Sequence, residues 1–189
     1  MTLHRATSID DAVAATGDYR AGGTDLQERL RHDVRARPLV DLAPLDELTR
    51  IDPADDGGVT VGALVTVATV ATDLAASHAA VAQTAAGLAT PQIRAVATIG
   101  GNLTQRTRCW YFRHPALSCL KSGGDGCLAR EGDHSLGVVF DLGPCVHPHP
   151  SSIGMSLLAS DAQISVTGSG RMAVADLWGD GSDPRATTS

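Results

Sequence analysis

Two pairs of adjacent glycines constrain the fold of this 189-residue chain more than any other feature. The first pair, Gly22-Gly23 in AGGTDLQ, stands where an expected strand meets an expected helix. The second pair, Gly100-Gly101 in ATIGGN, ends a further strand or turn. Because glycine has no side chain, a phosphate can closely approach the backbone N–H groups of such a bend. Each bend therefore predicts either exposed amides for a phosphate or an ordinary tight turn, and two such bends can hold one long ligand from both sides.

The first bend lies inside a strand–helix–strand pattern. Thr24 is a favourable helix N-cap, and Gln27 three residues later completes a capping box. The segment RPLVDLAPL supplies the second strand. The G-x-G-x-x-G pattern of the Rossmann fold does not occur.

The rest of the chain also mixes helices with strands. TRIDPADDGGVTVGA predicts a hairpin, and an Ala-rich helical stretch follows with a break near Ser77-His78. SIGMSLLASDA predicts a further helix, and AQISVTGSGRMAVADLW predicts a terminal hairpin. We therefore expect an α+β fold in two lobes, 1–53 and 57–177, followed by a polar tail at 178–189.

Composition narrows the class of protein. The chain is 43% hydrophobic and 19% charged, which is typical of a globular domain. It contains no run of eighteen apolar residues, so no membrane span is expected, and its first residues do not form a signal peptide pattern. The net charge of −6 argues against binding to nucleic acid.

All four cysteines fall in one segment, which also gathers aromatic and basic side chains. They are Cys109, Cys119, Cys127 and Cys145. Four is the number that a 4Fe-4S cluster or an all-thiolate zinc site requires, although no C-x-x-C pair occurs and buried unligated thiols remain an alternative. Around a cluster, Trp110 and Phe112 would exclude water. Its negative charge would be offset by four basic residues, Arg106, Arg108, Arg113 and Lys121.

The sequences AGGTDL and TIGGNL resemble the two flavin-binding signatures of the FAD-binding subunit of molybdenum hydroxylases, the group of xanthine dehydrogenase, carbon monoxide dehydrogenase and aldehyde oxidoreductase. The resemblance covers the chain to about Trp178 and implies the two-lobed, PCMH-like FAD-binding fold of that family, with a long cysteine-bearing loop inserted at about 104–150. It implies that both bends hold FAD, chiefly through the pyrophosphate. The implied cofactor-binding residues are Tyr19, Arg20, Ala21, Gly22, Gly23, Thr24, Asp25, Leu88, Thr98, Ile99, Gly100, Gly101 and Asn102.

The cysteine segment resembles an insertion found in one branch of that family. QRTRCWYFRH, Cys119, GGDGC and CVHPHP together are similar to the loop of the three-subunit aldehyde oxidoreductases and the 4-hydroxybenzoyl-CoA reductases. The resemblance implies that Cys109, Cys119, Cys127 and Cys145 bind an extra 4Fe-4S cluster. The run from Gln105 to Tyr111 is most similar to the aldehyde oxidoreductase branch.

Two departures from the family pattern stand out. Where the family has His-Pro-Ser-Asp with an aspartate that contacts FAD, this chain has Ser152 in place of the aspartate. We therefore expect Ser152 to make a weaker flavin contact. Family members also continue well beyond the length of this chain, so the resemblance implies that a C-terminal domain is absent from it.

The resemblance implies an oxidoreductase subunit for electron transfer rather than a subunit with its own acid–base catalysis. FAD here would receive electrons from a 2Fe-2S small subunit and a molybdenum-cofactor large subunit in a heterotrimer, and pass them to an external acceptor. The protein would be cytoplasmic, or periplasmic if it is exported with a partner that carries the signal. The alternative is a non-catalytic interaction domain in which the four cysteines hold zinc and the glycine bends bind nothing.

Overall fold

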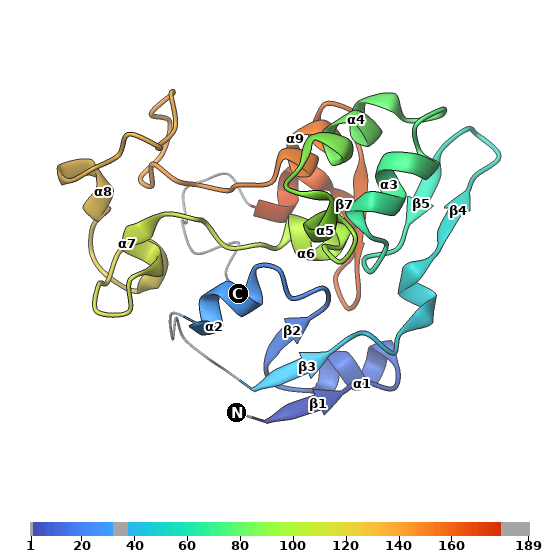
Figure 1. Ribbon diagram of the computed structural model, residues 1–189, viewed down its shortest axis with the longest axis horizontal. Helices are drawn as coiled ribbons and strands as arrows, with labels where there is room; N and C mark the ends of the chain where they lie inside the picture. Colours follow the sequence, from blue (N-terminus) through green and yellow to red (C-terminus); the bar gives the residue numbers. More distant parts are fainter. Residues whose placement is uncertain (1, 32–37, 179–189) are drawn as a thin grey trace.

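A computed structural model describes residues 2–31 and 38–178 of the chain (Figure 1). The N-terminal part is a three-stranded parallel sheet in the order β1-β3-β2, formed by β1 (Leu3–Arg5), β3 (Leu39–Asp41) and β2 (Asp18–Arg20). Helix α1 (Ile9–Ala14) follows β1, and α2 (Leu26–Arg31) follows β2. Because β2 and β3 pair in parallel, the expected strand–helix–strand unit around the first bend is confirmed.

A small apolar cluster holds this sheet and α1 together. Its buried members are Ala6, Ala12, Val40, Leu45 and Leu64, and Ala21 packs against them. Leu45 precedes a 3₁₀ turn, η1 (Asp46–Thr49), which leads out of the sheet. The cluster therefore fixes the end of β2, where the first glycine bend begins.

The larger part of the molecule is built from a hairpin and several short helices. The predicted hairpin is confirmed as β4 (Ile51–Pro53) paired antiparallel with β5 (Val59–Val61). The Ala-rich stretch forms α3 (Val67–Asp73) and α4 (Ala79–Gly87), so the break at Ser77-His78 is also confirmed. Further along the chain lie α5 (Pro91–Arg94), α6 (Ile99–Leu103), α9 (Ser152–Leu158), the hairpin β6 (Gln163–Val166) and β7 (Gly170–Ala173), and η3 (Val174–Trp178).

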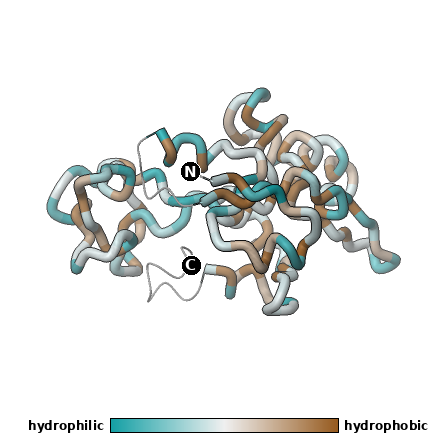
Figure 2. Tube along the Cα trace, turned by 90° about the horizontal axis from the view of Figure 1, so that it is seen from below, coloured by the Kyte–Doolittle hydropathy of each residue, from teal (hydrophilic) through white to brown (hydrophobic). Residues whose placement is uncertain are grey.

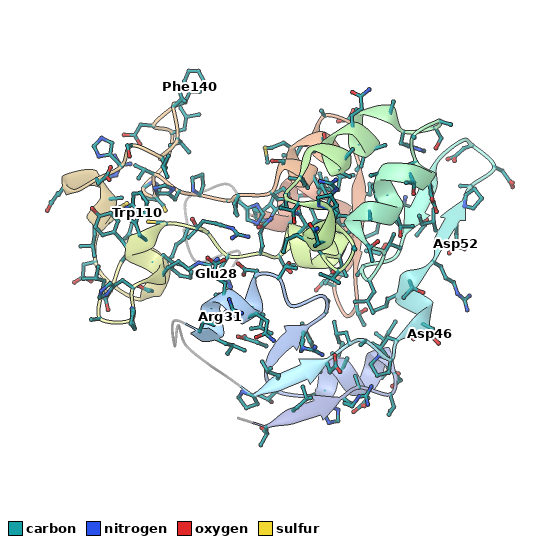
Figure 3. The ribbon with its side chains drawn as sticks, viewed as in Figure 1. Glu28, Arg31, Asp46, Asp52, Trp110 and Phe140 are labelled. Atoms are coloured by element: carbon teal, nitrogen blue, oxygen red, sulfur yellow. The ribbon has the colours of Figure 1, made fainter. Side chains whose placement is uncertain are left out.

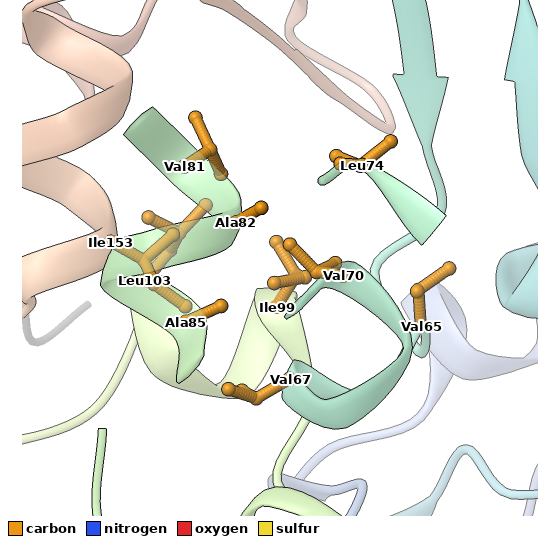
Figure 4. Packing of buried hydrophobic residues seen from close by; sticks show 10 residues of the cluster. All are labelled: Val65, Val67, Val70, Leu74, Val81, Ala82, Ala85, Ile99, Leu103 and Ile153. Atoms are coloured by element: carbon orange, nitrogen blue, oxygen red, sulfur yellow. The ribbon is translucent and has the colours of Figure 1, made fainter. Parts of the chain in front are cut away.

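The main apolar core lies between α3, α4, α6 and α9 (Figure 4). It consists mainly of small and branched residues, as expected for a chain with few aromatics: Val65, Val67, Val70, Leu74, Val81, Ala82, Ala85, Ile99, Leu103 and Ile153. Ile153 from α9 and Val67 from α3 are almost completely buried, so each contributes on the order of 2 kcal/mol through removal of apolar surface from water. This core holds α6, which carries the second glycine pair.

The cysteine segment, 104–150, extends away from both of these parts as a loop-rich arm (Figure 1). Hydrophilic and hydrophobic stretches alternate along it in Figure 2. Its regular structure is limited to α7 (Trp110–Arg113), η2 (Leu120–Ser122) and α8 (Leu128–Glu131). Its apolar cluster contains only Cys109, Phe112 and Cys119 as buried members, with Tyr111 and Leu128 against them. The arm is thus held by far less apolar packing than the rest of the chain.

Within the described residues, no helix is long and apolar enough to cross a membrane. The predicted boundaries of the two lobes stay a prediction, and all of the predicted polar tail except Trp178 lies outside the described residues.

Candidate functional site

The first glycine bend leaves a row of backbone amides without partners. Gly23 has a φ of +73°, in the left-handed region that glycine occupies at little cost. Among the described residues, the N–H groups of Gly22, Gly23, Thr24 and Asp25 donate to no acceptor of the chain. The first amide after them to find a backbone partner is that of Gln27, which donates to the Gly23 carbonyl at 2.8 Å. These amides are therefore unpartnered among the described residues, and phosphate binding at this bend stays a prediction.

The predicted capping box at this bend is wrong. Helix α2 begins at Leu26, two residues after the proposed cap. The Gln27 amide donates to the Gly23 carbonyl instead of the Thr24 hydroxyl. The left-handed turn at Gly23 closes a backbone turn around Thr24 and leaves the helix to start later.

The first bend lies directly against the chain that precedes the second bend. A Cβ atom on Gly22 would come within 1.7 Å of the Val96 carbonyl oxygen and 3.2 Å of the Ala97 nitrogen. Only glycine can approach another backbone this closely. Since Thr98 follows immediately, the two bends that are 78 residues apart in sequence meet in space.

The second bend has a different local structure from the one expected. Instead of ending a strand or turn, Gly100 and Gly101 lie inside the short helix α6, and Thr98 is its N-cap. The amides that follow Thr98 all donate to the chain itself: Ile99 to Val65 O (3.0 Å), Gly100 to Ala63 O (2.8 Å), Gly101 to Thr98 Oγ1 (3.2 Å) and Asn102 to Thr98 O (2.9 Å). The expectation of exposed amides at Gly100 and Gly101 is wrong, because the cap and the neighbouring loop satisfy them.

Two residues at the first bend that were expected to bind flavin form ion pairs within the chain instead. Arg20 donates from Nη1 to Oδ1 of the buried Asp41 at 3.0 Å, which joins two strands of the sheet. The Asp25 carboxylate pairs with Arg113 of the cysteine segment. Tyr19 is 53% exposed on β2, so its ring is free to contact a ligand.

The other residues that were expected to bind flavin lie on or beside the main apolar core. Leu88 packs against that core at the end of α4. The Asn102 Oδ1 atom accepts a hydrogen bond of 2.6 Å from the buried Ser151 hydroxyl. Ser152, the residue that replaces the family aspartate, is exposed at the start of α9, and its hydroxyl makes no hydrogen bond among the described residues.

Ser151 is a positioning residue that the sequence reading missed. Its hydroxyl also accepts from the Gly154 amide at 2.9 Å, so one side chain caps α9 and orients Asn102 of the second bend. The signal was present in the sequence, because a serine before a helical stretch is a common N-cap. That it would also reach Asn102, 49 residues away, could not be read from that pattern.

All four cysteines line one cavity in the arm. Each is a free thiol, and Cys109 and Cys119 are buried whereas Cys127 and Cys145 are half-buried. The cavity itself is small, about 10 Å³, and the empty space of about 280 Å³ around it includes open solvent. Besides the cysteines it is lined by residues that include Phe112, Tyr111, Leu128, Lys121 and His147. Residues spread over 37 positions of the sequence thus converge on one apolar space.

The surroundings of these thiols are dry and contain a buried cation. Burial raises the pKa of the Cys109 and Cys145 thiols, because a thiolate is poorly solvated there. Burial also lowers the pKa of Lys121, while the nearby Cys145 acts in the opposite direction. The Lys121 ammonium donates to the Pro148 carbonyl at 2.5 Å. A thiolate is therefore disfavoured here unless a positive group lies nearby, and Lys121 is such a group because its charge acts to lower the pKa of Cys145.

The cavity does not have the geometry of a single-ion site. Among the described residues, no group of three or more His, Cys, Asp or Glu side chains is placed to hold a metal ion. A zinc ion needs four sulfur atoms at about 2.3 Å from one point. The zinc alternative therefore has no support in the described part of the chain. The same finding gives no support to a 4Fe-4S cluster, for which the convergence of the four thiols on one cavity is the relevant observation.

The basic and aromatic residues expected around the thiols are only partly there. Lys121 and Phe112 line the cavity, as the reading of a shielded cluster requires. Arg108 and Arg113 instead pair with the acids Glu28 and Asp25 at the N-terminal end of the molecule. Trp110 is 48% exposed and does not line this cavity (Figure 3).

Comparison with known proteins matches the described part of the chain to one protein family. The family described as "FAD binding domain in molybdopterin dehydrogenase" matches residues 1–178. The aldehyde oxidoreductase FAD-binding subunit PaoB of Escherichia coli K-12 is 35% identical over 155 residues, which cover 77% of this chain and 47% of PaoB. The xanthine dehydrogenase FAD-binding subunit of Escherichia coli O157:H7 is 38% identical over 110 residues, which cover 54% of this chain and 38% of that subunit.

Solved structures of related enzymes match the fold over about half of this chain. The reconstituted CO dehydrogenase from Oligotropha carboxidovorans matches with a TM-score of 0.51 and 34% identity, over 55% of this chain and 39% of that chain. Quinoline 2-oxidoreductase from Pseudomonas putida 86 matches with a TM-score of 0.51 and 26% identity over the same shares. The chain spans less than half the length of the curated relatives that it matches.

Proposed function

We propose, since the chain belongs to the family of FAD-binding domains in molybdopterin dehydrogenases, that it holds FAD at the two glycine bends and transfers electrons within a molybdenum hydroxylase. The observation that supports the site most directly is the row of unpartnered amides from Gly22 to Asp25, packed against the chain that leads into the second bend. Backbone donors of this kind suit the pyrophosphate of a dinucleotide. When bound, FAD supplies a ring system that takes up and releases electrons, and the chain itself only has to hold and shield it.

The residues proposed to hold FAD divide into two roles. The amides of Gly22, Gly23 and Thr24 would donate to phosphate oxygens, and the exposed Tyr19 would contact the cofactor with its ring. At the second bend the amides are already bonded, so Thr98, Ile99, Gly100 and Gly101 would shape the wall rather than donate. Asn102, oriented by Ser151, would offer its side-chain amide. Ala21, Leu88 and Ser152 remain proposed contacts from the family pattern alone.

The second part of the proposal is a 4Fe-4S cluster on Cys109, Cys119, Cys127 and Cys145. It is supported by the convergence of all four free thiols on one apolar cavity. When bound, such a cluster supplies a one-electron relay. Lys121, whose ammonium is buried in the cavity wall, would offset its negative charge, and Phe112 would exclude water.

The proposed enzyme is an aldehyde oxidoreductase or a related xanthine dehydrogenase-type hydroxylase. PaoB aligns over 155 residues whereas the xanthine dehydrogenase subunit aligns over 110, and the surplus is comparable to the length of the cysteine segment. We therefore favour the aldehyde branch. The proposed partners are a 2Fe-2S subunit and a molybdenum-cofactor subunit in a heterotrimer, with an external electron acceptor. The cytoplasm is the proposed compartment, or the periplasm if a partner carries the export signal.

Anaerobic purification of the protein, with any subunits that accompany it, tests both cofactors. We expect the two near-ultraviolet and blue bands of flavin, a broad brown shoulder from the cluster, and about one FAD, four irons and four sulfides per chain. Cys127→Ser should remove the shoulder and most of the iron while FAD stays bound. Ser118→Ala, an exposed change beside Cys119, is the matched control and should retain both. Bound zinc without flavin or iron would overturn the proposal in favour of the interaction domain.

A further inference from the structure

The cysteine arm and the first glycine bend are joined by a largely buried ion pair. Arg113 donates from Nη2 to Oδ1 of Asp25 at 2.5 Å, and the two side chains are only 10% and 14% exposed. The other carboxylate oxygen of Asp25 accepts from the backbone amide of Arg106 at 3.2 Å. Asp25 lies in the bend with the free amides, and Arg113 ends α7, the helix that begins immediately after Cys109. One contact therefore connects the proposed flavin site to the wall of the cysteine cavity.

Arg113 is held on the arm side by further bonds. Its Nε donates to the Thr107 carbonyl at 2.8 Å, and its Nη2 also donates to the Arg106 carbonyl at 3.1 Å. Its own amide donates to the Cys109 carbonyl at 2.9 Å. The guanidinium is thus bonded to the two carbonyls that precede Arg108, and the Arg113 amide to the carbonyl of Cys109, so a shift of Cys109 is transmitted to Asp25.

A second contact between the same two regions is exposed to solvent. Arg108 donates to Glu28 at 2.9 Å, but the two side chains are 55% and 46% exposed. Exposed pairs contribute little because water and salt screen them, whereas breaking a buried pair leaves an uncompensated charge. The two regions are thus joined by a buried pair and an exposed pair, and Arg108 of the exposed pair forms no ion pair with Asp25 among the described residues.

We propose, resting on the function proposed above, that the Asp25–Arg113 pair is a joint through which the cysteine cavity and the flavin bend set each other's geometry. Asp25 is then a positioning residue and not a flavin ligand. Arg113 lies on α7, which begins directly after Cys109, so a cluster that fixes the position of Cys109 would also fix Arg113 and, through it, Asp25 and its free amide. Because both cofactors would then favour the same arrangement of this joint, their binding is positively coupled. Thermodynamic linkage requires that the cluster strengthen FAD binding by the same factor by which FAD strengthens binding of the cluster.

The test is the dissociation constant of FAD, measured by flavin fluorescence on protein stripped of iron by a chelator and on protein reloaded with iron and sulfide. For the unaltered protein we expect reloading to tighten FAD binding by about fivefold or more, the lower end of usual coupling factors. Asp25→Asn keeps the shape but removes the charge, and should bring the ratio of the two constants close to one. Arg108→Gln breaks the exposed Arg108–Glu28 pair but leaves the contact of 3.9 Å between Arg113 Nη1 and Glu28, and it should keep the ratio within about twofold of the original.

Arg113→Lys provides a second variant if Asp25→Asn does not fold, because lysine keeps the charge but cannot form the same fork of hydrogen bonds. It should also lower the ratio. A second readout is the rate of thiol labelling in the stripped protein, which FAD should slow in the unaltered chain and not in Arg113→Lys.

The outcomes separate the two proposals. FAD binding that is tight but equally strong in both states, or a ratio unchanged by Asp25→Asn and Arg113→Lys, would overturn the joint and leave the proposed function standing. Failure of FAD to bind in either state would overturn the proposed function, and the joint with it.

Discussion

The two glycine bends share a dipeptide but differ in what the glycines do. At the first bend the backbone amides from Gly22 to Asp25 are unpartnered among the described residues, and Gly23 takes a left-handed conformation. At the second bend the amides of Gly100 and Gly101 are bonded to Ala63 and Thr98, and both residues are helical. The first pair exposes donors, whereas the second pair allows a helix to pack closely on a loop.

This difference between the amides of the two bends shows that a Gly-Gly pair does not by itself indicate a phosphate site. The residue two positions before the pair differs between the bends. Thr98 places a hydroxyl where it accepts from the Gly101 amide, so the helix begins at once. Arg20 stands at the same position before the first pair and donates to Asp41 instead, so the amides there find no partner until Gln27. Substituting the glycines one at a time distinguishes three roles of these residues: close packing, backbone conformation and ligand binding.

The largest effect is expected for Gly22→Ala. The new Cβ would lie 1.7 Å from the Val96 carbonyl oxygen, a backbone atom that cannot rotate away. We expect the free energy of unfolding to fall by about 3 kcal/mol or more, at or above the usual cost of overpacking. Urea denaturation followed by circular dichroism measures this. Gly126→Ala, where the added Cβ meets no atom within 4 Å, is the control and should change stability little.

A smaller loss is expected for Gly100→Ala at the second bend. Its Cβ would lie 2.9 Å from both the Cβ and the carbonyl oxygen of Ala63. Overpacking of this size costs about 1–3 kcal/mol. The loop can give way in part, and Ala63→Gly removes one of the two contacts. The double variant should therefore regain part of the loss in urea denaturation. Complete independence of the two changes would show that Gly100 is not required for this approach.

Gly23→Ala tests backbone conformation alone. Open space surrounds the position apart from Gln27 Cγ at 3.6 Å, but the φ of +73° disfavours any residue with a Cβ. We expect a loss of about 1 kcal/mol, the usual strain of a left-handed residue. Gly23→Asn should lose less, because asparagine tolerates this conformation. Thermal denaturation ranks the two, and the reverse order would contradict the assigned φ.

These two bends also show how far the sequence alone leads. The strand–helix–strand unit, both hairpins and the break at Ser77-His78 follow from local periodicity and turn residues, and all are present in the structure. The amides of the first bend are unpartnered among the described residues, and phosphate binding there stays a prediction. The helix at the second bend was not predicted, since Ala63 and Val65 supply acceptors from more than 30 residues away.

The candidate site was predicted in part for the same reason. The sequence groups the four cysteines by composition, and the structure brings them to one cavity. It could not indicate that Arg113 and Arg108 turn away from the thiols toward Asp25 and Glu28, because these pairs span 88 and 80 residues. Contacts of this kind depend on how the lobes and the arm meet, which no local pattern encodes.

Gly101→Ala is expected to have the smallest effect and is the most informative about the flavin site. Its Cβ would lie 3.0 Å from Thr98 Oγ1, a side-chain atom that can shift by a few tenths of an ångström. Alanine gains about 0.5–1 kcal/mol over glycine inside a helix, which offsets that contact and leaves stability nearly unchanged. If the amide of residue 101 stays bonded to Thr98 when FAD is present, affinity measured by flavin fluorescence should change less than twofold. Thr98→Ala, which removes the cap and costs about 1 kcal/mol, is the comparison. A large loss of FAD affinity in Gly101→Ala with unchanged stability would mean that the amides of the second bend become available to the cofactor. Both bends would then donate backbone amides to FAD.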